Sequence, residues 1–309
     1  MPVNNGKIGA MDLQQFLNSR RAGVLAQQLS RSLPPRLGYW LADRVAGQIS
    51  GRRDLPMLRN IRANQRVVRG ELSVEQLDAA VEDVLRNIAR AFYDLFHYAD
   101  RPAVLQRFVA RSQAIDDLIL RCQNRAGGMI VCGLHMSNFD LAYQAVTSQG
   151  LRSIGLTMPD ATEGIAWQHE LRRRAGLEIM PASLSNLRHV IQRLKAGEIV
   201  VTGIDRPMAE VKCRPRFFGR PAQVPVHYVQ LALRAGVPVM VMAAVMGEDG
   251  RCHVLASEPV ELRSYSDRET EILANAERVL EIGQDFIRQA PAQWVITQPV
   301  WPEVLDERL

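Results

Sequence analysis

The residues of this sequence best suited to catalysis are His135 and Asp140, with four residues between them in the segment His-Met-Ser-Asn-Phe-Asp. An imidazole whose second N–H is bound by a carboxylate keeps one tautomer and can take a proton from a hydroxyl as a general base. No protein nucleophile accompanies the pair, so the attacking hydroxyl would belong to the substrate. The spacing alone is weak evidence, because it fits equally well a loop histidine that only hydrogen-bonds its neighbour.

The elements around this pair place the histidine at the end of a strand. The apolar run 129–134 predicts a strand that ends at His135, and the residues after it predict a helix with Ser137 or Asn138 as its N-cap. Asp140 would then lie in the first helical turn, close enough to accept the imidazole N–H. The backbone amides at Ser137 and Asn138 are candidates for binding an oxyanion.

Beyond Arg125, short apolar runs alternate with helical patterns up to a long C-terminal helix. The predicted strands cover 129–134, 153–158, 177–181, 199–204, 237–245 and 252–256. The predicted helices cover 138–149, 162–175, 184–196, 225–235 and 267–290, and a loop of Pro, Gly and Arg precedes residue 224. This alternation predicts an α/β fold with a mixed, mostly parallel sheet flanked by helices. Ligands of such sheets bind beyond the carboxyl ends of strands, where His135 is expected.

The N-terminal third shows helical periodicity only, including a capping box formed by Ser73 and Gln76. We therefore divide the chain into an N-terminal helical, membrane-facing region, 1–122, and an α/β core, 123–309. The apolar residues of segment 11–50 lie on a strongly basic background. That pattern fits a helix at a membrane interface, and it fits equally well a helix packed against the sheet.

The composition of the chain indicates which kinds of partner the protein can bind, and it says less about the reaction. The chain has 309 residues, of which 47% are hydrophobic, enough for a sizeable core. The net charge of +5 favours an anionic partner, such as nucleic acid, a phospholipid surface or a phosphate-bearing substrate. No RRM, zinc-finger or helix-turn-helix signature supports nucleic acid. The four cysteines have neither C-x-x-C spacing nor clustered histidines, so we expect no metal site.

Other patterns exclude several classes of protein. No apolar run reaches the roughly 18 residues that span a bilayer, and the N-terminus lacks a signal-peptide pattern. Any contact with a membrane is therefore expected from the cytoplasmic side. Motifs for a serine hydrolase, a nucleotide-binding loop and a zinc protease are absent. The remaining histidines have no carboxylate at a useful spacing and are predicted to be structural: His97, His169, His189, His227 and His253.

Four motifs occur in a fixed order along the chain. They are His135-x4-Asp140, Arg172-Arg-Arg-Ala-Gly176, Gly203-Ile-Asp-Arg-Pro207 and Phe217-Phe-Gly-Arg-Pro-Ala222. On these motifs, residues 35–295 resemble the lysophospholipid acyltransferase superfamily. Within it, the chain is similar to the lipid A late acyltransferases and the related phosphatidylinositol mannoside acyltransferases, and the sequence Asp-Arg in the third motif looks more like the mannoside branch.

The resemblance implies roles for individual residues. His135 would be the general base and Asp140 its orienting partner. Arg172 and Arg174 would hold the substrate, although three adjacent arginines also fit a solvated basic helix face. The third and fourth motifs supply further substrate-binding candidates: Asp205, Arg206, Phe217, Phe218, Gly219 and Arg220. The two phenylalanines and the glycine would form a turn that closes an acyl channel, and ordinary core packing explains them equally well.

The resemblance also implies a reaction: O-acylation of a lipid or glycolipid at an anionic membrane surface. It implies a peripheral protein on the cytoplasmic face of the cell's inner membrane. The donor would be acyl-CoA or acyl-carrier-protein, and because its thioester is already activated, no cofactor is expected. Two alternatives remain open at this point. One is an acyltransferase of a natural-product pathway that acts on an amine or a carrier-bound acceptor, and the other is a catalytically silent lipid-binding protein with the same fold.

Overall fold

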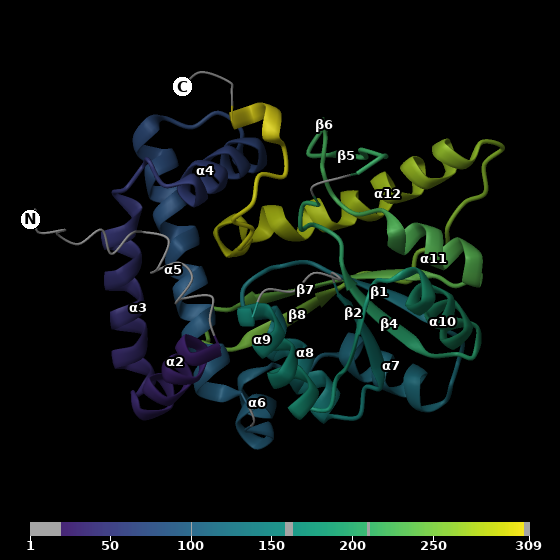
Figure 1. Ribbon diagram of the computed structural model, residues 1–309, viewed down its shortest axis with the longest axis horizontal. Helices are drawn as coiled ribbons and strands as arrows, with labels where there is room; N and C mark the ends of the chain where they lie inside the picture. The colour runs from purple at the N-terminus through teal and green to yellow at the C-terminus, as the bar shows by residue number, and fades with distance from the viewer. Residues whose placement is uncertain (1–19, 100, 158–162, 209–210, 306–309) are drawn as a thin grey trace, which may run out of the picture.

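A six-stranded sheet forms the centre of the molecule (Figure 1). The computed structural model describes residues 20–99, 101–157, 163–208 and 211–305. Across the sheet the order is β3 (Glu178–Pro181), β2 (Ser153–Thr157), β4 (Ile199–Gly203), β1 (Met129–Gly133), β7 (Val239–Met246) and β8 (Cys252–Ala256). Neighbouring strands are parallel except β7 and β8, which are antiparallel. The predicted mixed, mostly parallel sheet is therefore confirmed.

The register of β1 and β4 brings His135 and Asp205 to the same edge of the sheet. Gly133 at the end of β1 pairs with Gly203 at the end of β4. His135 and Asp205 each follow their paired glycine by two residues, so the chain delivers both to the same carboxyl edge of the sheet. The side chains of β1 and β4 are almost all buried, because helices cover both faces of the sheet.

The two faces of the sheet carry separate hydrophobic clusters. One face, with Ile130, Leu134 and Val241, packs under α10 (Leu184–Lys195), α11 (His227–Ala235) and α12 (Arg268–Gln289). The other face, with Met129 and Val131, packs under α6 (Pro102–Phe108), α7 (Gln113–Gln123) and α8 (Phe139–Ser148). Helix α9 (Glu163–Arg174) lies beside α8 (Figure 1). The sheet is thus the middle layer of three.

The N-terminal helices gather around α5 (Val74–Tyr98), against which α2 (Arg20–Ser32), α3 (Pro35–Ser50) and α4 (Pro56–Arg69) pack (Figure 1). Ser73 and Gln76 form the predicted capping box at the start of α5. Helices α3 and α5 approach closely at Gly38, where a Cβ would lie 2.1 Å from the Tyr93 ring. A larger residue at position 38 would push the two helices apart.

Helices α2 and α3 leave an apolar stripe in solvent, with Leu29 58% exposed and Trp40 56% exposed. The other exposed members are Val24, Leu25, Leu37, Leu41 and Val45. These residues belong to the segment predicted either to face a membrane or to pack on the sheet, and they do not pack on the sheet. Residues 11–19 of that segment lie outside the described residues. Within the described helices, none combines the length and apolar character required to cross a bilayer.

One segment expected to be a loop forms a small hairpin. Strand β5 (Arg216–Phe217) pairs antiparallel with β6 (Arg220–Pro221). The turn between them has positive φ at both central residues, 50° at Phe218 and 74° at Gly219. Two consecutive positive φ angles match the twist of a tight hairpin, which explains why so short a pair of strands forms here.

Candidate active site

His135 lies at the carboxyl edge of the sheet with its main chain held on both sides. The Leu134 N–H donates to the Met242 carbonyl at 3.0 Å, and the Val295 N–H donates to the His135 carbonyl at 3.0 Å. Gly203 makes room for the imidazole, because a Cβ at that position would lie 2.6 Å from the ring carbon Cε1. The glycine in the third motif is therefore required by the packing of the histidine.

The carboxylate that holds His135 belongs to Asp205. Its Oδ1 lies 2.6 Å from His135 Nδ1, and its Oδ2 accepts the His135 backbone N–H at 2.8 Å. Because an ionised carboxylate can only accept, Nδ1 carries the proton and Nε2 keeps its lone pair. The predicted pairing of His135 with Asp140 is wrong, and Asp205, predicted to bind substrate, is fully buried behind the ring instead.

Asp140 is occupied by Arg172. The guanidinium donates from Nε to Oδ1 at 2.6 Å and from a terminal nitrogen to Oδ2 at 2.7 Å. Burial lowers the pKa of Arg172, but the charge of Asp140 and the hydrogen bonds to it raise that pKa by more. The net effect is a raised pKa, so the arginine stays charged. This bidentate ion pair joins α8 to α9. The His135 ring is bonded to Asp205 and not to Asp140.

A third donor to Asp205 comes from the C-terminal segment. Trp294 Nε1–H donates to Oδ2 at 2.8 Å. The same segment is bound to the loop after His135, since Met136 and Trp294 form an antiparallel bridge and the Ser137 N–H donates to the Gln293 carbonyl at 2.7 Å. Sequence reasoning missed Trp294, because nothing in its local pattern shows that its indole would reach a carboxylate 89 positions away.

His135 lines a cavity of about 560 Å³. Most of its wall is apolar and comes from the strands and the surrounding helices. The apolar wall includes Leu118, Val131, Val146, Leu151, Leu156, Ile179, Leu187, Met208, Met242 and Val254. The polar part of the wall includes Asp140, His169, Arg172, Thr202, Arg206 and His227. A mainly hydrophobic space with a few convergent polar groups suits a ligand with a long apolar part and one reactive polar end.

Arg206 also lines this cavity, and none of the described residues forms a hydrogen bond or an ion pair with its guanidinium. The pKa of Arg206 is lowered, mainly by burial. The negative charge of Asp205 acts to raise this pKa, and the positive charge of Arg172 lowers it further. A half-buried arginine to which no described side chain is bonded favours an anionic ligand, and phosphate is a group that arginine binds well.

Two histidines predicted to be structural also line the cavity. Burial lowers the pKa of His227 to about 4, and its Nε2 lies 3.1 Å from the Thr202 hydroxyl. Burial and the neighbouring charge of Arg172 lower the pKa of His169 to about 4. Both rings are therefore neutral near pH 7. The prediction missed their position because spacing to a carboxylate was the criterion, and neither histidine uses one.

Of the two predicted oxyanion donors, the backbone amides of Ser137 and Asn138, the first is engaged elsewhere. The Ser137 amide is the one bound to the Gln293 carbonyl, and the Asn138 side-chain amide donates to Asp94 Oδ2 at 2.9 Å. Asn138 occupies the N-cap position of α8 without a side-chain capping bond. The amide proton of Ser137 is thus unavailable to an oxyanion, which corrects that part of the prediction.

Several predicted substrate-binding residues do not line the cavity. Phe217 is fully buried and stacks on Trp301 with ring centroids 5.6 Å apart, so core packing accounts for it. Phe218 and Gly219 form the hairpin turn, and Arg220 is exposed on β6. Arg174 points to solvent and pairs with Glu170 at 3.2 Å. Of the two arginines predicted to hold substrate, the structure places Arg172 alone at the cavity.

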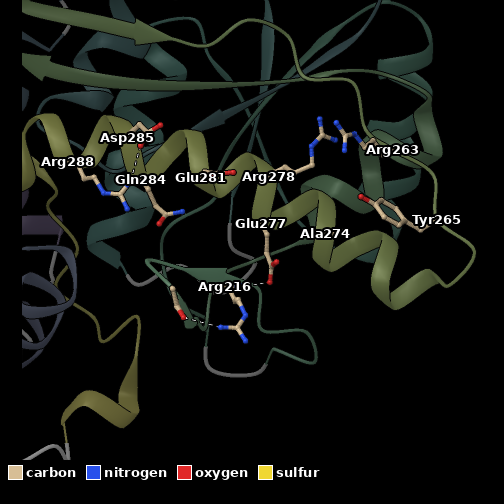
Figure 2. A pocket seen from close by; sticks show the side chains of 11 residues that line it. Arg216, Arg263, Tyr265, Ala274, Glu277, Arg278, Glu281, Gln284, Asp285 and Arg288 are labelled. Carbon is tan, nitrogen blue, oxygen red and sulfur yellow. Dashed lines mark hydrogen bonds and ion pairs between the residues drawn. The ribbon is translucent and has the colours of Figure 1, made fainter. Parts of the chain in front are cut away.

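A second, shallower pocket of about 480 Å³ lies on the outer face of α12 (Figure 2). Its arginines alternate with acidic residues, as in the ion pair between Arg288 and Asp285, and Arg216 bonds the Gly219 carbonyl across the hairpin. It shares no lining residue with the His135 cavity. Among the described residues, no group of three His, Cys, Asp or Glu side chains could hold a metal ion.

A three-layer α/β fold in which a histidine bonded to a carboxylate lines a mainly apolar cavity is an arrangement suited to acyl transfer. Comparison with protein families agrees: the model of the bacterial lipid A biosynthesis acyltransferases matches residues 13–303. The match covers nearly the whole chain, and the protein belongs to this family. Membership implies transfer of an acyl group from a donor to a lipid acceptor, and it suggests an association with membranes. A search of curated proteins found no match.

Proposed function

We propose that this protein transfers a fatty acyl group from acyl-CoA or acyl-carrier-protein to a hydroxyl of a lipid or glycolipid, with His135 as the general base. The observation that carries the proposal is the pair formed by His135 Nδ1 and Asp205, 2.6 Å apart, on a ring that lines a mainly apolar cavity. The protonated Nδ1 leaves Nε2 as the basic atom available to the acceptor hydroxyl.

The reaction then needs only the two substrates. Nε2 takes the proton as the acceptor oxygen attacks the thioester carbonyl, and a tetrahedral oxyanion forms. The C–S bond breaks, the departing sulfur takes the proton from the imidazolium, and an ester and a free thiol remain. Asp205 stabilises the imidazolium between these steps, and general base catalysis of this kind contributes about 10²–10⁴-fold. The apolar wall would hold the acyl chain.

Arg206 is proposed to bind the anionic group of a substrate near the reacting centre. Arg206 lines the cavity and forms no ion pair with a carboxylate of the described residues, whereas the charge of Arg172 is balanced by Asp140. A phosphate of the acyl donor and a phosphate of the lipid headgroup share this chemistry. An Arg206→Gln variant would show which one is bound, by a rise of KM for the donor or for the acceptor.

The exposed stripe on α2 and α3 is proposed to rest on an anionic membrane surface. Leu29, Trp40 and Leu41 would enter the headgroup region, while exposed Arg36 and Arg44 would meet lipid phosphates. This arrangement would make the N-terminal helices the membrane-facing region and 123–309 the catalytic core. A peripheral position on the cytoplasmic face of the inner membrane, where the acyl donors are made, fits both substrates.

The experiment that tests the proposal is an acyl-transfer assay with long-chain acyl-CoA and acyl-carrier-protein as donors and hydroxyl-bearing glycolipids as acceptors. His135→Ala should lose about 10³-fold in rate while keeping the fold. His189→Ala removes an exposed histidine of α10 and should keep the wild-type rate. A His135→Ala enzyme of near-native activity would refute the proposed base. Transfer only to amines would favour an acyltransferase of a natural-product pathway. Lipid binding without thiol release would favour a catalytically silent lipid-binding protein.

A further inference from the structure

Another buried carboxylate, Asp94 near the end of α5, is hydrogen-bonded to α3 and to the start of α8. It is 1% exposed. The Tyr39 hydroxyl of α3 donates to its Oδ1 at 2.7 Å, and Asn138 Nδ2 donates to its Oδ2 at 2.9 Å. The nearest cation, Arg90, is engaged by Asp43 through two hydrogen bonds of 2.7 and 2.6 Å. Asp94 is therefore held by two neutral donors.

Asn138 connects this carboxylate to the loop that carries the histidine. It follows His135 by three residues, and its side chain binds Asp94 instead of capping α8. Ser137, between them, has a φ of 45°, which side chains with a Cβ adopt rarely and at a cost. Such a loop keeps its shape only when the surroundings hold it. The Gln293 carbonyl holds one side of this loop through the Ser137 N–H, and Asp94 holds the other.

We propose that Asp94 is a positioning residue for acyl transfer: by holding Asn138 it fixes the loop 135–138, and with it the direction of the His135 ring. This inference rests on the proposed role of His135 as the base. The ring must present Nε2 to the acceptor hydroxyl while Nδ1 stays on Asp205, so a small rotation of the loop would harm both contacts. A displacement of about 1 Å in a catalytic group can cost about 10²-fold in rate.

The chemistry of the site explains why a carboxylate stands at position 94. Tyr39 donates to one terminal atom of residue 94 and Asn138 donates to the other. An ionised carboxylate accepts at both terminal atoms, whereas an amide has an acceptor oxygen at one of them only. Burial is the main cause that raises the pKa of Asp94 to about 7, so the ionised form is costly here. The other titratable groups near it are Arg90, Tyr93, Tyr98 and Cys252. None of these donates a hydrogen bond to Asp94.

The test compares Asp94→Asn with Tyr93→Phe in the full-length protein. Tyr93 is the neighbouring buried residue of α5, and its hydroxyl bonds Leu33 and His97, away from the catalytic loop. Asp94→Asn should lower kcat by about 10- to 100-fold and change KM by less than about twofold, because the chemistry and not the binding is disturbed. Tyr93→Phe should lose stability to a similar degree and keep kcat within about twofold.

A double-mutant cycle separates positioning from general destabilisation. Asn138→Ala breaks the same link from its other end, so Asp94→Asn/Asn138→Ala should be no more than about twofold slower than either single variant. Additive losses, or equal kcat in Asp94→Asn and Tyr93→Phe, would overturn the inference. If Asp94→Asn does not fold, Tyr39→Phe and Asn138→Ala are compared with Tyr93→Phe in its place. An unchanged kcat in both of these variants would overturn the positioning role of Asp94.

The NMR signal of the His135 ring tests the link independently of the reaction. Asp94→Asn should shift the His135 Cε1 proton resonance in the ligand-free protein, whereas Tyr93→Phe should leave it in place. An unchanged resonance in Asp94→Asn overturns the positioning role even if no acceptor is ever found. A shifted resonance in a protein that transfers no acyl group would instead refute the proposed function alone.

Discussion

Two buried aspartates flank the His135 cavity, and their partners differ. Asp205 receives three N–H groups, from the imidazole, from the His135 backbone and from the Trp294 indole. Asp140 receives the guanidinium of Arg172 through both oxygens. A carboxylate bound to neutral donors keeps a charge that can stabilise an imidazolium, whereas one paired with arginine is already neutralised. Asp205 is therefore suited to catalysis and Asp140 to holding α8 and α9 together.

The comparison also shows that nearness along the chain is a poor guide to pairing. Asp140 follows His135 within the same loop and helix start, yet its side chain turns to α9. Asp205 is 70 positions away, and the parallel pairing of β1 with β4 brings it behind the ring. Substitutions of Asp205 and its partners should therefore have different consequences from substitutions of Asp140 and its partner.

The largest effect is expected for Asp205→Asn. The amide keeps the shape of the carboxylate but has one acceptor oxygen for three donors, and it favours the wrong imidazole tautomer. We expect kcat to fall by about 10³–10⁴-fold, measured as thiol release from acyl-CoA, with an unchanged circular dichroism spectrum. Near-native kcat would show that Asp205 does not serve the histidine.

The next effect is expected on stability, from Asp140→Asn. It leaves Arg172 buried without its counter-charge, and breaking a buried pair in this way costs about 3–5 kcal/mol. Urea unfolding measures the loss, and the folded fraction should keep kcat within about tenfold. Glu170→Gln removes the exposed partner of Arg174 on the same helix and should cost less than about 1 kcal/mol. A fall in kcat as large as that of Asp205→Asn, with stability intact, would assign Asp140 a chemical role after all.

The two cavity histidines predict a pH dependence of stability. Their pKa values are about 4 in the folded protein and about 6.5 in the unfolded chain, so the unfolded state binds protons first as the pH falls. The free energy of unfolding should therefore decrease from about pH 6.5 towards pH 4, by up to about 1.4 kcal/mol per pH unit for each histidine. His227→Gln should flatten this slope, and His189→Gln, an exposed control, should not. Equal slopes in all three proteins would contradict the burial of His227.

The smallest effect is expected for Trp294→Phe, which removes one of the three donors to Asp205. We expect a loss of about tenfold in kcat, because the carboxylate keeps its two bonds to His135. Trp301→Phe is the matched control, since its Nε1 is buried without a hydrogen-bond partner in the described chain. Stability should fall similarly in both variants, and kcat should fall in Trp294→Phe alone. Equal kcat values would show that the indole only packs.

Apolar periodicity predicted both the helices whose apolar face is buried and those whose apolar face is exposed, and it did not distinguish the two kinds. The stripe of α5, with Val81, Val84 and Leu85, is buried, whereas the equally regular stripe of α3, with Trp40 and Leu41, is exposed. Periodicity reports that one face of a helix is apolar, and only the neighbours decide whether that face is covered. For this reason the sequence left the interfacial and the packed interpretations of segment 11–50 open.

The sequence by itself determined the order of the six strands of the main sheet and of the helices between them, the cap at Ser73 and the place of His135 at the end of a strand. These features depend on local periodicity and on residues within one or two turns of each other, which a sequence displays directly. Tertiary structure alone decided that Asp205, Trp294 and Asp94 converge on the histidine loop. Each reaches it from a separate element, and hydrogen bonds across such distances along the chain depend on strand register and helix packing that no local pattern encodes.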